Sequence, residues 1–238
     1  MEQYRHLLPS GYKPAPTLTL ESRERARRGW AAGIGAALIA LAVKFKTVLL
    51  FLLNFKWVAL GLKFLFSFGT LLLSIVAWAQ VWGLSFAVGF VLLILVHELG
   101  HYFAIRAYGM QAGLPVFVPF LGAFTTHKDP APNAMANAII ALAGPALGGL
   151  GALACYVAGA QTGDPFWYAL ASTMFFINLF NLIPFGPLDG GHIMAAFGPA
   201  AQPMSRVERW LIGGGTVALA SMLVIMWRIA GSAVHLAR

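Results

Sequence analysis

Long stretches without a charged side chain constrain this sequence more than any other feature. No Asp, Glu, Lys or Arg occurs between Lys63 and Glu98, or between Asp129 and Asp164. Only 10% of the residues are charged and 59% are hydrophobic, whereas an average soluble domain is about 25% charged. Such a chain has too little polar surface to cover an apolar core in water, and it is too apolar for disorder. The sequence therefore predicts a polytopic membrane protein.

The apolar segments after residue 66 predict five membrane-spanning helices. They cover residues 67–84, 86–107, 134–159, 166–183 and 209–229. Residues 30–66 are ambiguous, because lysines interrupt their apolar sequence. They fit either one or two basic amphipathic helices on the membrane surface or a short sixth spanning helix. We therefore expect an all-α polytopic membrane protein with about six transmembrane helices.

Positive charge is concentrated at the start of the chain and orients the predicted helices. Residues 1–66 contain ten Lys or Arg and three Glu, a net charge of +7 out of a total of +8. Because basic residues favour the cytoplasmic face, residues 1–29 are expected to form a basic cytoplasmic tail without a cleavable signal peptide. The basic residues are interleaved with apolar stretches, which favours contact with membrane lipids and argues against nucleic acid. We expect a bacterial or archaeal cell-membrane protein.

The segment HELGH at residues 97–101 places polar groups within an apolar helix. His97 and His101 are four residues apart, so both imidazoles lie on one helical face and can reach one zinc ion. Glu98 lies beside them, where it can accept a proton from a water that the metal makes more acidic. Since these polar side chains are costly inside a membrane, the segment is the strongest functional candidate.

A catalytic zinc site needs a third protein ligand, and few acidic residues remain to supply it. Asp164 falls on the opposite face of the membrane in the predicted topology. Asp129 lies in a polar loop and is expected to be solvated. Glu208 stands between Arg206 and Arg209, where a solvated ion pair is expected. These three acidic residues are therefore weak candidates.

Asp189 is the remaining acidic residue, and its surroundings favour a site. It lies in NLIPFGPLDGGH at residues 181–192, within the loop expected at 186–206. The prolines are expected to stop the preceding helix, and the glycines to allow a tight turn. The same stretch ends in His192, which we interpret as a supporting or structural residue. His127 is expected to be an ordinary loop histidine, with a place in the lining of the site as the alternative.

HELGH and NLIPFGPLDGGH together resemble the paired motifs of the site-2 protease family of intramembrane zinc metallopeptidases. The resemblance covers about residues 67–200. It implies one Zn²⁺ ion bound by His97, His101 and Asp189. It also implies that Glu98 is the general base and that Asn181 helps to hold the substrate or the oxyanion. The substrate would be a transmembrane or membrane-tethered protein, cut near its cytoplasmic end.

In this family a membrane re-entrant β-hairpin occupies the position of residues 113–126. Here these residues are apolar and β-prone, yet Pro115 and Pro119 interrupt them, so an ordinary connecting loop is the alternative. An unpaired strand edge could bind an unwound substrate by strand addition. We expect a compact family member without a PDZ or nucleotide-sensing domain, in which residues 67–200 form the protease core. Residues 201–238 would supply the C-terminal transmembrane helix.

The predicted function is intramembrane zinc endopeptidase activity of the kind used in regulated intramembrane proteolysis. One alternative is a membrane-anchored HExxH peptidase that uses Glu208 as its third ligand. Another is a membrane metal transporter or a non-catalytic scaffold with the same ligands.

The single cysteine, Cys155, excludes an intrachain disulfide and a cysteine-rich metal site. Small residues at 143–151 are expected to serve close helix packing.

Overall fold

The computed structural model describes residues 7, 9–11, 13, 20–53, 55–199 and 201–236. The chain divides into two units, Met1–Ala59 and Leu60–Arg238. Of the tail expected at residues 1–29, residues 1–6, 8, 12 and 14–19 lie outside the described residues. Its last part is helical, because the first long helix begins at Leu20.

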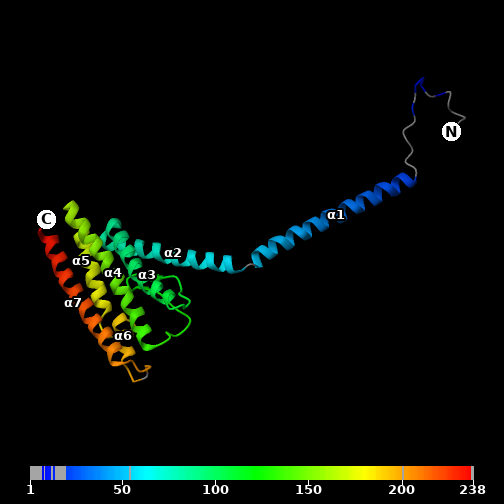
Figure 1. The fold of residues 1–238 in the computed structure, drawn as a ribbon. Coiled ribbons are helices and arrows are strands. Elements are labelled where there is room, and N and C mark those ends of the chain that lie inside the picture. The colour runs from blue at the N-terminus through cyan, green and yellow to red at the C-terminus, as the bar shows by residue number, and fades with distance from the viewer. Residues whose placement is uncertain are drawn as a thin grey trace. The chain divides into compact units, whose positions relative to one another are not determined.

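The segment that the sequence left ambiguous is helical. Helix α1 comprises Leu20–Leu53, and helix α2 comprises Phe55–Trp82 (Figure 1). Each contains a stretch long and apolar enough to cross a membrane, Arg28–Val48 in α1 and Trp57–Trp82 in α2. Helix α2 therefore begins well before residue 67, where the sequence placed its start. Lysine is a good helix former, so the lysines of this region do not end the helix.

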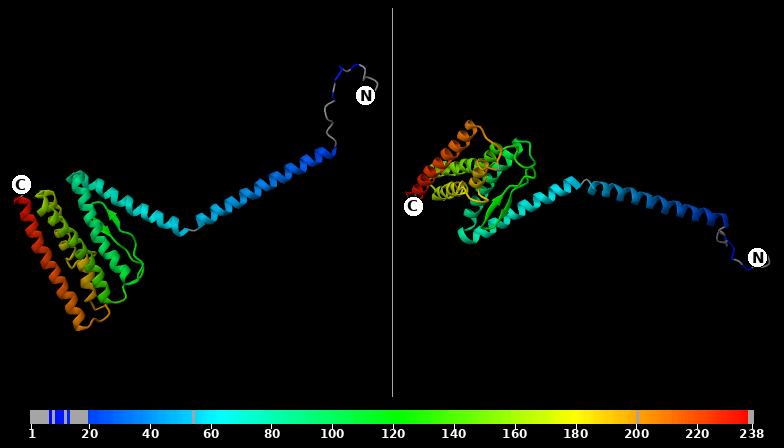
Figure 2. Two further views of the ribbon diagram at one scale, coloured as in Figure 1. Left: turned by 45° about the horizontal axis from the view of Figure 1, so that its top comes forward. Right: turned by 90° about the horizontal axis from the view of Figure 1, so that it is seen from below.

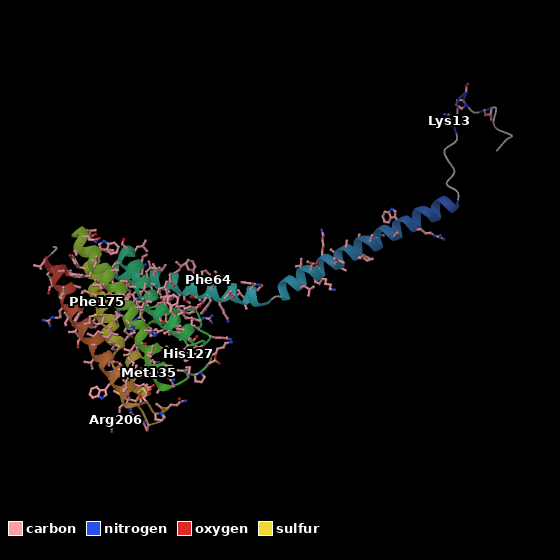
Figure 3. The ribbon with its side chains drawn as sticks, in the orientation of Figure 1. Lys13, Phe64, His127, Met135, Phe175 and Arg206 are labelled. Atoms are coloured by element: carbon pink, nitrogen blue, oxygen red, sulfur yellow. The ribbon has the colours of Figure 1, made fainter. Side chains whose placement is uncertain are left out.

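The second unit contains a bundle of helices (Figure 1). Its long members are α3 (Leu84–Ala107), α4 (Ala134–Thr162), α5 (Pro165–Asn181) and α7 (Arg206–Leu236). Helix α3 packs against α4, α4 against α5, and α5 against α7. Phe175 lies in the buried core between these helices, with 1% of its surface exposed (Figure 3).

The helix lengths establish an all-α polytopic membrane protein. Five helices of the described chain are long and apolar enough to cross a membrane: α1, α2, α3, α4 and α7. Helix α5, expected to be a spanning helix at residues 166–183, has 17 residues. It is at the lower limit of the length that crosses a bilayer.

Two acidic residues cap helices instead of forming ion pairs. The Asp164 carboxylate accepts a hydrogen bond from Phe166 N at 2.9 Å, at the start of α5. Glu208 Oε2 accepts from Ser205 N at 2.7 Å, and Ser205 Oγ accepts from Glu208 N at 3.2 Å, which is a capping box. The expected ion pair of Glu208 with a neighbouring arginine was wrong: no such pair occurs in the described part of α7. The free backbone N–H groups at the helix start are the stronger local partner.

The loop expected at residues 186–206 contains a short helix, α6 (Asp189–Ala196), that packs against α4. The sequence pattern did not indicate this helix, because glycine is a poor helix former and two glycines follow Asp189. Packing against the bundle offsets that cost.

Residues 113–126 form a β-hairpin, which confirms the β interpretation over an ordinary loop. Strand β1 (Val116–Val118) pairs antiparallel with β2 (Gly122–Phe124), and Phe117 lies opposite Ala123. Strand β2 contacts α3, and the hairpin runs alongside that helix (Figure 2). Two side chains of α2 bind β1 and the residue before it: Ser67 Oγ donates to Pro115 O at 2.5 Å, and Thr70 Oγ1 accepts from Phe117 N at 3.2 Å.

Candidate active site

Helix α3 carries three ionisable side chains on its buried face. His97, Glu98 and His101 are 4%, 5% and 9% exposed. The two histidines lie one helical turn apart and point in the same direction, with their Nε2 atoms 3.1 Å apart. Buried polar side chains inside a membrane helix need partners, so the neighbouring elements decide what these groups can do.

The backbone before α6 brings Asp189 to the histidines. The chain turns through Gly186 with φ 46°, and Asp189 is the first residue of α6. Gly190 is packed so closely against the carbonyl oxygens of Leu182 and Ile183 that a Cβ would overlap them. Its backbone is not in the left-handed region. Gly186 thus allows the tight turn expected from the sequence, whereas Gly190 is needed for the close approach of two backbone segments.

His97, His101 and Asp189 converge on one point. His97 Nε2 lies 3.2 Å from Asp189 Oδ2, and His101 Nε2 lies 3.2 Å from Asp189 Oδ1. Each residue offers one ligand atom, and these atoms lie within 4.8 Å of one another. Two ligands of a tetrahedral zinc ion, each about 2.0 Å from the metal, would be about 3.3 Å apart. The spacing of the three side chains therefore matches a zinc site.

The hydrogen bonds on the far side of each imidazole support the same conclusion. His97 Nδ1–H donates to Asn178 Oδ1 at 2.7 Å, and His101 Nδ1–H donates to Ile140 O at 2.8 Å. In its neutral form, each ring then directs the lone pair of its Nε2 towards the other ring and towards Asp189. Asp189 Oδ2 is buried without a hydrogen bond from any described residue. Converging acceptors repel one another unless a cation lies between them, so this set of donor atoms fits a metal ion.

Glu98 is held by the segment that follows the hairpin. Thr125 Oγ1 lies 2.9 Å from Glu98 Oε2 and 3.3 Å from Glu98 O, so its hydroxyl can donate to the carboxylate. Glu98 does not belong to the group of three possible ligands. Its carboxylate therefore stays available for proton transfer beside the metal-binding group.

One cavity of about 350 Å³ joins these groups. The five residues singled out in the sequence all line it: His97, Glu98, His101, Asn181 and Asp189. Neither Asp129, Asp164 nor Glu208 does so. The structure therefore offers no support for Glu208 as an alternative ligand.

Two further histidines line the cavity. His127, expected to be an ordinary loop residue, follows the hairpin (Figure 3), and its Nδ1 bonds to Asp129 O. His192 is exposed on α6, and its backbone oxygen accepts from Asn137 Nδ2 at 3.2 Å. The sequence did not place His127 here, because the pairing of Ala112 with His127 that folds this loop back is not local.

Asn178 is the residue that sequence reasoning missed. It is fully buried in α5 and bonds directly to His97. A signal was present, because an asparagine is costly in an apolar helix. It also lies three residues before Asn181, so the two share one face.

These features define a class: a helical membrane protein with a buried metal-binding group of two histidines and an aspartate beside a glutamate. The sequence profile of peptidase family M50 matches residues 85–164 and 160–223, which is more than half of the chain. The chain therefore belongs to peptidase family M50. This confirms the resemblance to the site-2 protease family.

Two individual relatives are named zinc metalloproteases, which agrees with the family assignment. Rip3 of Mycobacterium tuberculosis, named a zinc metalloprotease, is 34% identical over 163 residues, which cover 62% of this chain and 41% of Rip3. A zinc metalloprotease of Methanocaldococcus jannaschii is 30% identical over 129 residues, which cover 52% of this chain and 37% of the relative. The chain thus matches less than half the length of these relatives. No solved structure matches it significantly.

Proposed function

We propose that this protein is a zinc-dependent intramembrane endopeptidase that cuts transmembrane or membrane-tethered proteins. The observation that carries this proposal is the convergence of His97, His101 and Asp189 on one point at a cavity inside a membrane bundle. Membership of a peptidase family supports it. When bound, zinc polarises the scissile carbonyl and makes a water molecule more acidic.

Glu98 is the general base in this proposal. Its carboxylate lines the cavity beside the metal-binding group, where it can accept a proton from the attacking water. The same group can then donate this proton to the leaving amine. The Thr125 hydroxyl holds one carboxylate oxygen, which fixes the direction of the other. Asn181, at the end of α5, lines the same cavity, and its amide can hold the substrate carbonyl oxygen.

The outer edge of β2 is the proposed binding site for substrate backbone. Because Phe117 N bonds outward to Thr70, the opposite residue Ala123 directs its own N–H and C=O to the other edge of the hairpin. Ala123 lines the active-site cavity. A substrate strand added there would lie in extended form beside Glu98. A transmembrane helix must unwind to be cut, because its peptide groups are otherwise bonded within the helix.

We place the active site towards the cytoplasmic side of a cell membrane. The site lies in the second half of α3, and Arg106 is in the last turn of that helix. Lys63 lies near the start of the apolar stretch of α2, and Lys128 lies in the loop after the hairpin. These basic residues favour the cytoplasmic face for this end of the bundle.

Zinc analysis and cleavage of a model transmembrane substrate test the proposal together, using the purified full chain. The wild type should hold one zinc ion and cut the substrate. Asp189→Ala should lose both properties, whereas Glu98→Gln should keep zinc and lose cleavage. Glu208→Gln, which alters only the cap of α7, should keep both.

Three results would contradict the proposal. If Asp189→Ala kept zinc and activity, the ligand assignment would be wrong. If the wild type cut no substrate but moved zinc across proteoliposomes, the protein would be a metal transporter. A protein that neither cuts nor transports would be a zinc-binding scaffold.

A further inference from the structure

The two histidines of the site are held by different kinds of acceptor. His101 donates to a backbone oxygen, that of Ile140 on α4. His97 donates to a side chain, Asn178 Oδ1 on α5, at 2.7 Å. The Asn178 contact can therefore be removed by substitution, while the Ile140 contact remains.

Asn178 is fixed where it can do little except bind His97. None of its surface is exposed. A Cβ on Gly148 of α4 would lie against both Oδ1 and Nδ2 of its amide. Its Nδ2 finds no hydrogen-bond acceptor within the described structure. A buried amide with an unpaired donor lowers stability, so helix packing alone is a poor reason for asparagine here.

We propose that Asn178 is a positioning residue of the zinc site and that it acts through His97. The proposal rests on the function given above. By accepting from Nδ1–H, the amide oxygen fixes the ring orientation and selects the tautomer whose Nε2 lone pair faces Asp189 and His101. An acceptor on Nδ1–H also makes Nε2 a better ligand.

Helix α4 provides the space for this arrangement. Gly148 leaves room for the Asn178 amide, and one turn earlier a Cβ on Gly144 would overlap the His101 ring. The small residues of α4 thus do more than allow close helix packing. They seat one metal-binding histidine directly and the other through Asn178.

Zinc affinity, measured by competition with a chelator and without any activity assay, tests this role. Asn178→Ala should weaken zinc binding about 10- to 100-fold, the usual effect of losing such a partner. Asn178→Asp keeps an acceptor of the same shape and cannot donate, so it should bind zinc within about threefold of the wild type. Visible absorption of the cobalt-substituted proteins should change for Asn178→Ala and stay close to wild type for Asn178→Asp, because it reports ligand geometry.

Two controls on the same helix separate positioning from packing. Met174→Ala removes a fully buried side chain one turn earlier. It should lower thermal stability and leave the zinc affinity of the folded protein unchanged. Asn181→Ala removes the proposed substrate-binding amide, so it should reduce cleavage and keep zinc affinity.

The outcomes distinguish this proposal from the proposed function. If the wild type bound no stoichiometric zinc, the function itself would fail. If the wild type bound zinc and Asn178→Ala bound it equally well, only the role of Asn178 would be overturned. Equal losses in Asn178→Ala and Asn178→Asp would also overturn it, because packing would then explain both. If Asn178→Ala does not fold, Gly148→Ala, which displaces the amide without removing it, must weaken zinc binding for the proposal to stand.

Discussion

Helices α3 and α7 are equally apolar over their spanning segments, yet their surroundings differ. In α3, 44% of the spanning window is buried in protein, whereas in α7 the share is 11%. Three of the ionisable residues of the site, His97, Glu98 and His101, lie on the buried face of α3. The only acidic residue of α7, Glu208, lies at its capped start. Hydropathy thus identifies both helices, but only contact with protein allows one of them to carry a polar site.

Removal of the metal should have the largest effect. A strong chelator should abolish cleavage completely, because His97, His101 and Asp189 would lose the ion that polarises the substrate. Added zinc should restore it. An activity assay before and after dialysis measures this. Full activity in a demonstrably zinc-free protein would show that the group on α3 is not catalytic.

Substitution of the proposed general base, Glu98, is expected to have the second largest effect. Glu98→Gln should lower the cleavage rate about 10²- to 10⁴-fold, the usual contribution of such a group, with zinc content unchanged. Glu208→Gln on α7 should change the rate by less than about twofold. If Glu98→Gln and Glu208→Gln lowered the cleavage rate equally, the buried glutamate of α3 would have no special role in catalysis.

Two glycine substitutions test the packing of the same helices. A Cβ on Gly100 of α3 would overlap the backbone of Ala143 and Gly144, whereas Gly214 of α7 has open space beside it within the described residues. Gly100→Ala should therefore destabilise the protein by about 1–3 kcal/mol through overpacking. Gly214→Ala should be neutral or slightly stabilising, by up to about 1 kcal/mol. Thermal unfolding in detergent measures both, and a neutral Gly100→Ala would contradict the close contact.

The smallest effect on the cleavage rate is expected from removal of the Thr125 hydroxyl. Thr125→Val removes the hydrogen bond to the Glu98 carboxylate and should reduce cleavage about tenfold, which is the value of one hydrogen bond to a charged group. Thr216→Val on α7 removes only a bond to Ile212 O in its own helix, so cleavage should stay nearly constant. Steady-state kinetics with one substrate compares the two variants. A Thr125→Val enzyme as active as the wild type would show that Glu98 is positioned without it.

Local patterns in the sequence identified much of the fold and the main candidates. Hydropathy located α3, α4 and α5 within three residues at each end, whereas α7 extends seven residues beyond its predicted end. The four-residue spacing placed both histidines on one face, and the scarcity of acidic residues singled out Asp189. By contrast, the start of α2, the helix α6 and the cap formed by Glu208 depended on competition between local preferences and packing. No single pattern in the sequence resolves that competition.

By itself, then, the sequence determined that the chain is a membrane protein with a metal-binding motif, because burial in lipid and helical spacing follow from residue type and position alone. Only the tertiary structure decided which polar groups meet. The contact of Asn178 with His97 joins residues 81 positions apart, and it depends on the absence of a side chain at Gly148 on a third helix. Lipid and protein are equally apolar neighbours, so hydropathy cannot tell which face of a helix will find such partners.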